Sequence, residues 1–366
     1  MFRRLFGRKR ASDINPAEGT PEPDARELHG HAAGGLTRAQ LEFLSRLPPI
    51  DDHAMRVWDP NVGSVESCVK SLQKLGFIRE ASPAEKLDRT HSVAQLKKLA
   101  TQYGSRKSGN KALIIDSLLA VIPDRSLRAL VEGVRLYAPT ETGEAIVADF
   151  KQAKALERSD MEAEAANALR AGRIEQAANV VAAYEAKQVF GRGMGINWSK
   201  GMSDTTQEQA ALLLNSSYDD LPLDPSKQEE VAVGLALSDL LGQGSREAAR
   251  RLMHLTEGKF ACPELEAYLR DKGHGGYASG AKPDNPRDVA EVYAHTRLFA
   301  ASSQITLARL KRHRTGKGVE ILPVNDDCKI CSGGPYRYAW SGLTDLPSLP
   351  LHWGCRCTYV PWVELD

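Results

Sequence analysis

The chain has 366 residues, of which 42% are hydrophobic and 26% are charged, and its 48 basic and 47 acidic side chains leave a formal net charge of +1. This length allows two or three domains with sizeable cores. The charge balance excludes a globally basic protein, so any contact with nucleic acid depends on a local basic patch. No apolar run approaches the roughly 18–20 residues that span a bilayer, and we expect a cytoplasmic protein without membrane contacts.

The N-terminal segment, residues 1–36, is rich in Gly, Pro, Ala and charged residues and shows no apolar periodicity. Its first ten residues carry the positive charge of a signal peptide but lack the apolar stretch that should follow. We predict a disordered basic tail. An arm that binds nucleic acid or a membrane surface is the alternative.

An N-terminal helical domain is predicted over residues 37–123. Thr37 is placed to cap a short first helix, and a second helix is expected over residues 64–75, where Gly76 ends it. The domain closes with a pair of helices at residues 91–122.

This helix pair is predicted from two amphipathic segments joined by a glycine-containing turn. Apolar side chains recur at helical spacing, at Val93, Leu96, Leu99, Ala100 and Tyr103 in the first segment and at Ala112, Ile115, Leu118, Leu119 and Ile122 in the second. Ser92 is a suitable N-cap for the first helix, and Gly104 ends it. The pair contains one acid, Asp116, and its basic side chains are Lys97, Lys98, Arg106, Lys107 and Lys111.

The pattern resembles the SAP family, in which a helix with a Leu-Lys pair and a glycine-containing turn precede a Ser-Gly-x-Lys opening and a second helix with a Leu-Leu pair. The matching residues are Leu96-Lys97, Gly104, Ser108-Gly109-Asn110-Lys111 and Leu118-Leu119. The resemblance implies DNA binding. The charges in this segment also favour phosphate binding. Arg106, Lys107 and Lys111 surround a predicted helix N-terminus, where free N–H groups and the positive dipole end suit a phosphate. We expect weak, salt-sensitive and largely sequence-tolerant binding; a protein-interaction hairpin is the alternative.

Residues 124–285 are predicted to be a helical scaffold without a cofactor. An alanine-rich helical pair is expected at residues 161–190, and further helices are expected at residues 204–217, 226–242 and 244–256. The Gly-Arg-Gly-Met-Gly segment at residues 191–195 lacks the preceding strand and the following Lys-Ser/Thr of a phosphate loop, so we interpret it as a plain loop.

Residues 286–366 combine a long helix with a cysteine-rich tail. Asn285 is a suitable N-cap, and Pro286 suits the first helical position, so a helix is predicted over residues 286–312. The cations at its end, residues 309–314, are favourable beside the negative helix terminus without any ligand.

The tail carries four of the six cysteines together with a histidine, in Cys-x2-Cys and His-x2-Cys-x-Cys patterns. These residues are Cys328, Cys331, His352, Cys355 and Cys357. In an intracellular chain such a cluster indicates a metal site before it indicates disulfides. Zinc takes four nitrogen or sulfur ligands in a tetrahedron, so four of the five are expected to bind one structural zinc ion. Buried cysteines without a metal, or a redox pair, are the alternatives.

The same tail resembles the C-terminal end of phage head-morphogenesis proteins of the Mu F-like minor head class. A long helix and a short extended segment lead into Asp326-x-Cys328-x2-Cys331, and Leu346-Pro347 precedes the run from His352 to Cys357. That class often has His-Pro-Asn-Cys-Arg-Cys where this chain has His-Trp-Gly-Cys-Arg-Cys. The resemblance implies a virion protein that assembles with portal or capsid subunits.

Together these patterns predict an all-α fold: a multi-helix body, a SAP-like helix-turn-helix hairpin and a small zinc-knuckle-like C-terminal module. The expected function is non-catalytic DNA binding, with a phage or prophage minor head protein as one alternative. A nuclease or toxin that uses the zinc only as scaffold is the other. No catalytic residues are predicted, because His254, His274 and His295 are isolated in the sequence.

Overall fold

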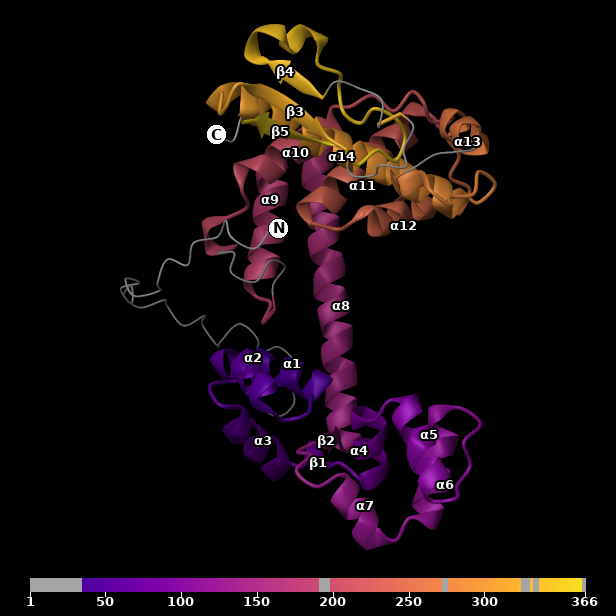
Figure 1. Cartoon of the computed structure of the whole chain (residues 1–366). Helices are drawn as coiled ribbons and strands as arrows, with labels where there is room; N and C mark the ends of the chain where they lie inside the picture. The colour runs from indigo at the N-terminus through magenta and orange to yellow at the C-terminus, as the bar shows by residue number, and fades with distance from the viewer. Residues whose placement is uncertain (1–34, 191–197, 272–275, 324–329, 332–335, 364–366) are drawn as a thin grey trace. The chain divides into compact units, whose positions relative to one another are not determined.

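The computed structural model describes residues 35–190, 198–271, 276–323, 330–331 and 336–363 (Figure 1). Within this part of the chain the protein is mostly helical, as expected, but two small antiparallel sheets depart from a purely all-α fold. The chain divides into two compact units, Met1–Ala153 and Lys154–Asp366, and the division falls inside α8 (Glu141–Arg170). The finer domain boundaries predicted after residues 36, 123 and 285 stay predictions.

Of the N-terminal tail predicted to be disordered, only the last two residues lie within the described part of the chain. None of the described helices has a stretch that is both long and apolar enough to cross a membrane.

The first unit contains seven short helices and one two-stranded sheet. Its helices are α1 (Arg38–Arg46), α2 (Asp52–Val62), α3 (Val65–Lys74), α4 (Pro83–Thr90), α5 (Val93–Gln102), α6 (Lys111–Val121) and α7 (Asp124–Leu130), and its strands are β1 (Ile78–Glu80) and β2 (Tyr137–Pro139), all within the described residues. The predicted caps are confirmed. Thr37 and Ser92 each accept a hydrogen bond from the third helical residue, whose glutamine side chain accepts one in return.

The four helices α4–α7 are inserted between two strands that pair with each other. Strand β1 runs antiparallel to β2, with Ile78 opposite Pro139 and Glu80 opposite Tyr137. The inserted helices enclose a core of their own, which is made of Leu87, Leu96, Ala100, Ile114, Ile115, Leu118, Ile122, Leu127 and Val131. The two helices predicted at residues 91–122 are therefore present as α5 and α6, but they form half of a four-helix unit.

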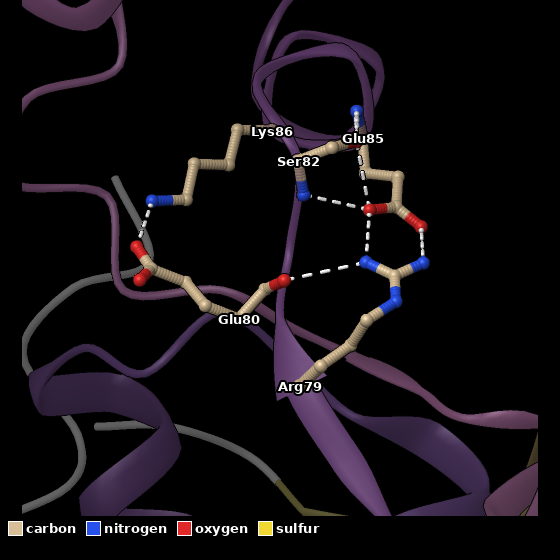
Figure 2. Close-up of polar contacts among 5 residues, drawn as sticks. All are labelled: Arg79, Glu80, Ser82, Glu85 and Lys86. Carbon is tan, nitrogen blue, oxygen red and sulfur yellow. Dashed lines mark hydrogen bonds and ion pairs between the residues drawn. The ribbon is translucent and has the colours of Figure 1, made fainter.

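A network of polar contacts joins β1 to the start of this inserted unit (Figure 2). The Arg79 guanidinium donates to both carboxylate oxygens of Glu85, at 2.8 and 2.9 Å. The same carboxylate accepts from the backbone N–H of Ser82 at 2.7 Å, while Lys86 donates to Glu80 at 2.7 Å. Because Ser82 and Glu85 also form the capping box of α4, one carboxylate fixes both the helix start and its connection to the strand.

The second unit holds the longer helices and a three-stranded sheet. Besides the C-terminal part of α8, its helices are α9 (Ile174–Ala186), α10 (Asp204–Leu214), α11 (Pro225–Leu240), α12 (Ser245–Leu255), α13 (Pro263–Arg270) and α14 (Pro286–His313), with short 3-10 turns η1 (Trp198–Lys200), η2 (Gly276–Ala278) and η3 (Trp340–Asp345) and the strands β3 (Gly318–Leu322), β4 (Arg337–Ala339) and β5 (Thr358–Trp362). Asn285 caps α14 as predicted, since its side chain accepts from the backbone N–H of Arg287.

Helix α11 is the centre of the second unit's core. Its residues from Val231 to Ser238 are all buried, and α10, α12 and α14 pack around it. A partly buried ion pair holds the segment after α10 to α14: the Arg297 guanidinium lies 2.5 Å from the Asp220 carboxylate, which also accepts from the Tyr293 hydroxyl at 3.1 Å. Arg297 stacks over the rings of Tyr218 and Tyr293, at 5.2 and 5.0 Å from their centres.

The three-stranded sheet has the order β4-β3-β5, with both pairs antiparallel. It lies beside the C-terminal end of α14 (Figure 1), and Leu307 and Leu310 of that helix pack against its core. Val319 and Ile321 of β3 are buried in this small core, together with the three described cysteines of the tail. The extended segment predicted near residues 319–324 is thus the central strand that supports the cysteine cluster.

Candidate functional site

Three cysteines of the tail converge on one point. The Sγ atoms of Cys331, Cys355 and Cys357 all lie within 4.8 Å of one another, and all three side chains are buried. Cys355 and Cys357 lie just before β5, and the Cys357 backbone N–H donates to Cys355 Sγ at 3.4 Å. A cluster of three buried sulfurs with a backbone N–H donor has the chemistry of a metal-thiolate site.

His352 is the fourth side chain at this point. Its Nε2 lies 3.0 Å from Cys331 Sγ, while Nδ1 lies 2.8 Å from the carbonyl oxygen of Trp353. A carbonyl oxygen can only accept a hydrogen bond, so we assign the proton to Nδ1. This tautomer leaves the Nε2 lone pair facing the sulfurs, which is the form in which histidine binds a metal.

The ring of His352 is held by a residue that lies far away in the sequence. The hydroxyl of Tyr268, on α13, is 3.0 Å from His352 Nδ1, and the two rings stack with their centres 6.2 Å apart. Groups that hold the second nitrogen of a metal-binding histidine fix both its tautomer and its orientation. Tyr268 lies 84 residues before His352, and no periodicity or motif of the sequence singled it out.

The loop that carries His352 and Cys355 is docked on α14. The backbone N–H of Gly354 donates to Thr296 Oγ1 at 3.0 Å, and its carbonyl accepts from the Tyr277 N–H at 2.9 Å. His295 Nε2 donates to the Cys355 carbonyl oxygen at 3.3 Å. The helical body therefore places two of the four side chains.

The pKa values of two thiols of the cluster are shifted in opposite directions. A hydrogen bond from the Cys357 thiol lowers the pKa of Cys355 well below that of a free cysteine, although burial acts in the opposite direction. The same hydrogen bond, together with burial, raises the pKa of Cys357. A thiolate is thus already favoured at Cys355, and thiolates are the form in which cysteines bind metals.

The distances can be compared with those of a tetrahedral zinc site. Two sulfurs that bind the same zinc at about 2.3 Å are about 3.8 Å apart, and Cys331 Sγ and Cys355 Sγ are separated by 3.8 Å. The 3.0 Å between Cys331 Sγ and His352 Nε2 would have to widen by about half an ångström. The three thiols are thus close enough to share one metal ion, whereas His352 contacts Cys331 and is not within 4.8 Å of all three sulfurs, so it would have to move to complete a tetrahedron.

Of the five predicted metal ligands, the structure brings three together, Cys331, Cys355 and Cys357, and places His352 in contact with Cys331. Cys328 lies outside the described residues. Cys68 and Cys262, the two cysteines outside the tail, are buried in the first and second units.

Of the predicted basic residues, Lys97 and Lys98 lie in the middle of α5, Arg106 and Lys107 lie in the turn, and Lys111 begins α6. Lys97, Lys98, Arg106 and Lys107 are exposed, and none of them forms an ion pair with a carboxylate among the described residues. Lys111 differs, because it is half-buried and its ammonium pairs with Asp88 at 3.2 Å. Four of the five predicted cations are thus open to an anion, whereas the fifth connects α6 to α4.

The turn itself is ordered by hydrogen bonds. The Asn110 side chain caps α6 by accepting from the backbone N–H of Leu113 at 3.0 Å. The Arg106 N–H donates to Ser117 Oγ at 2.9 Å, and its guanidinium donates to the Ser108 carbonyl oxygen at 2.9 Å. These contacts hold Arg106 and Lys107 beside the N-terminus of α6.

Comparison of the chain with protein-family models, with characterised proteins and with solved structures gives no match. The resemblances to the SAP family and to the minor head proteins therefore rest on the local motifs given above.

Proposed function

We propose that this protein is a non-catalytic DNA-binding protein that contacts the phosphate backbone through a SAP-like helix pair, α5 and α6. The observation that carries the proposal is the group of four exposed cations, Lys97, Lys98, Arg106 and Lys107, without carboxylate partners among the described residues. Phosphate contacts from such side chains position a protein on DNA but read no sequence. Binding is therefore sequence-tolerant and falls steeply with salt.

The end of helix α6 adds to this surface. The first N–H groups of a helix have no partner within the helix, and the helix dipole places partial positive charge there. Asn110 satisfies the N–H of Leu113, while Arg106 and Lys107 lie four and three residues before this cap. Lys111 contributes less than the sequence pattern indicated, since Asp88 already neutralises it.

The test is a salt titration of DNA binding by the full-length protein. Changing Lys97→Gln and Lys107→Gln together is expected to weaken binding to all duplex sequences alike, and to reduce the slope of log K against log salt by about two, or about 0.9 per phosphate contact. The matched control is Lys70→Gln with Lys74→Gln, which removes two exposed lysines of α3 in the same unit. Equal affinities and slopes for the two double variants would reject this function, and cleavage of the DNA in the presence of Mg²⁺ would favour the nuclease alternative.

We further propose that the cysteine cluster binds one structural zinc ion. Cys331, Cys355, Cys357 and His352 supply three sulfurs and one nitrogen, a donor set typical of zinc. With all four bound, the ion has no open position for a substrate, so the site stabilises the tail and carries no catalysis. Protein purified without added metal is expected to contain about one zinc per chain.

A minor head protein of a phage or prophage is the second proposed function. The observation that favours it is that Cys355 and Cys357 of the motif shared with that class converge with Cys331, and that His352 of the same motif contacts Cys331. Such a protein would assemble with portal or capsid subunits. Detection of the chain in purified particles by mass spectrometry supports this role, whereas its absence from particles and presence in the cell extract contradict it.

A further inference from the structure

A second basic surface lies at the C-terminal end of α14 and in the turn that leads to β3. We call it the C-terminal basic cluster; its members are Arg309, Lys311, Arg312, His313, Arg314 and Lys317. The sequence from residue 309 to residue 319 contains no acidic residue. All six side chains are exposed.

The cations at the centre of the cluster have no carboxylate partners. Lys311, Arg312 and Arg314 form no ion pair with an acid anywhere in the described part of the chain. Arg309 donates to the Thr205 hydroxyl, a neutral group that leaves its charge uncompensated. This distinguishes the cluster from the arginines of α8 and α12, where Arg158, for example, pairs with Glu162 at 2.9 Å.

The backbone that carries the cluster is held in place. Arg314 adopts the left-handed conformation, with φ of 46°, and its N–H donates to the Leu310 carbonyl oxygen at 2.8 Å. Gly316 also has a positive φ, and its carbonyl oxygen accepts from Trp340 Nε1 at 3.0 Å. The N–H of Lys317 donates to the Trp362 carbonyl oxygen at 2.8 Å. Arg314 and Lys317 therefore lie in a turn that is fixed to the sheet, directly after the helical members of the cluster.

The helix dipole alone does not account for so many cations. One or two positive side chains in the last turn are enough to interact with the partial negative charge there, and the effect is lost within one turn. Lys317 lies beyond the helix, and each further cation repels those already present. A cluster of this kind raises the local positive potential and favours an external anion.

We infer that the C-terminal basic cluster binds the phosphate backbone of nucleic acid. Three of its members, Arg309, Arg312 and Arg314, carry planar guanidinium groups that match the geometry of phosphate oxygens. A membrane surface fits less well. Helices that bind lipid insert an apolar face, whereas α14 buries its apolar side chains, Val289, Val292 and Ile305 among them, inside the protein.

This inference does not rest on the function proposed for α5 and α6, because the two surfaces lie in different units of the chain.

The experiment measures binding of the full-length protein to a DNA duplex of about 30 base pairs by fluorescence anisotropy over a salt series. The test variant combines Lys311→Gln, Arg312→Gln and Arg314→Gln. Its matched control removes three exposed cations elsewhere in the same unit, Lys227→Gln, Lys259→Gln and Arg287→Gln. We expect the test variant to lose at least about tenfold in affinity near 100 mM salt and about two to three units of salt slope, while the control stays close to the unchanged protein.

Two further variants separate the possible outcomes. Replacing Arg312→Lys and Arg314→Lys keeps the charge and should retain most of the binding, with a smaller loss from the missing planar guanidinium groups. The hairpin variant Lys97→Gln with Lys107→Gln tests the other surface. If it alone lowers affinity and slope while the test variant matches its control, this inference is overturned and the proposed function stands. The inference would also be overturned if two results came together: vesicles with about 30% phosphatidylserine bind only the unchanged protein, and all variants bind DNA equally.

Discussion

Gly354 shows at the scale of one residue how the tail depends on the helical body. Its φ of 72° lies in the region that glycine adopts without strain. A Cβ at this position would lie 2.6 Å from the backbone nitrogen of Ala278, which cannot move as a flexible side chain would. The residue stands between His352 and Cys355, so its backbone sets the positions of two cluster side chains.

We therefore expect Gly354→Ala to destabilise the docked loop by about 1–3 kcal/mol and to weaken zinc binding. The control is Gly342→Ala, because Gly342 has a negative φ and nothing lies within 4 Å of its added Cβ. Competition for zinc with a chromophoric chelator, together with tryptophan fluorescence during thermal unfolding, measures both effects. Equal zinc affinity and equal unfolding temperature for the two alanine variants would show that the close contact with Ala278 can be relieved.

At the scale of elements, the connection between β1 and α4 depends on the ionised form of Glu85. Hydrogen bonds from the Arg79 guanidinium lower the pKa of Glu85 from 4.5 to about 2. The stabilisation is therefore complete above pH 4.5, where the group is ionised in both folded and unfolded chains. It is lost as the pH falls from 4.5 to about 2, because the unfolded chain binds the proton first.

The side chain of Glu85 is 38% exposed, so solvent screening reduces the interaction to about 1 kcal/mol. Glu85→Gln should lower the free energy of unfolding of the first unit by about this amount at pH 7. The difference from the unchanged protein should disappear toward pH 2. Urea unfolding followed by circular dichroism at several pH values measures it, with Glu132→Gln, an exposed acid without an ion pair in the described residues, as the control. A pH-independent difference would mean that the glutamine disturbs the α4 cap rather than the charge interaction.

At the scale of the whole molecule, the tail and the body differ in what stabilises them. The second unit's body encloses a large apolar core around α11 and α14. The sheet module instead has a small core in which three of the seven buried residues are the cysteines of the cluster. Its few aliphatic side chains do not offset the entropy of ordering the tail, so the proposed metal ion would supply part of the folding free energy of this module.

Removal of zinc with a strong chelator is therefore expected to loosen the tail and leave the helical body folded. Proteolysis should become rapid within residues 330–363, while the helical circular dichroism signal decreases only slightly. Limited proteolysis with mass spectrometry, combined with elemental analysis, follows both changes. A protein that contains no zinc and yet has a protease-resistant tail would refute the structural role of the metal.

Local patterns in the sequence predicted the features that depend on neighbouring residues. The caps at Thr37, Ser92 and Asn285 were predicted because capping depends on a side chain and the next three residues. The strands β1 and β2 were not predicted, since three-residue strands show no periodicity and their pairing joins segments about sixty residues apart. Lys111 was predicted to face a phosphate, but it pairs with Asp88 on another helix. Such a contact between separate helices leaves no periodic signal in the sequence either.

The sequence by itself determined the helical character of the body, the helix pair at α5 and α6, and the set of cysteines and histidine in the tail, because spacing along the chain encodes each of them. Only the tertiary structure decided which of those side chains meet. It placed Cys331 beside His352 and Cys355, brought Tyr268 of α13 to the imidazole, and docked Gly354 on α14. The physical reason is that burial and hydrogen bonding between distant segments depend on how the chain packs, and packing leaves no periodic signal in the sequence.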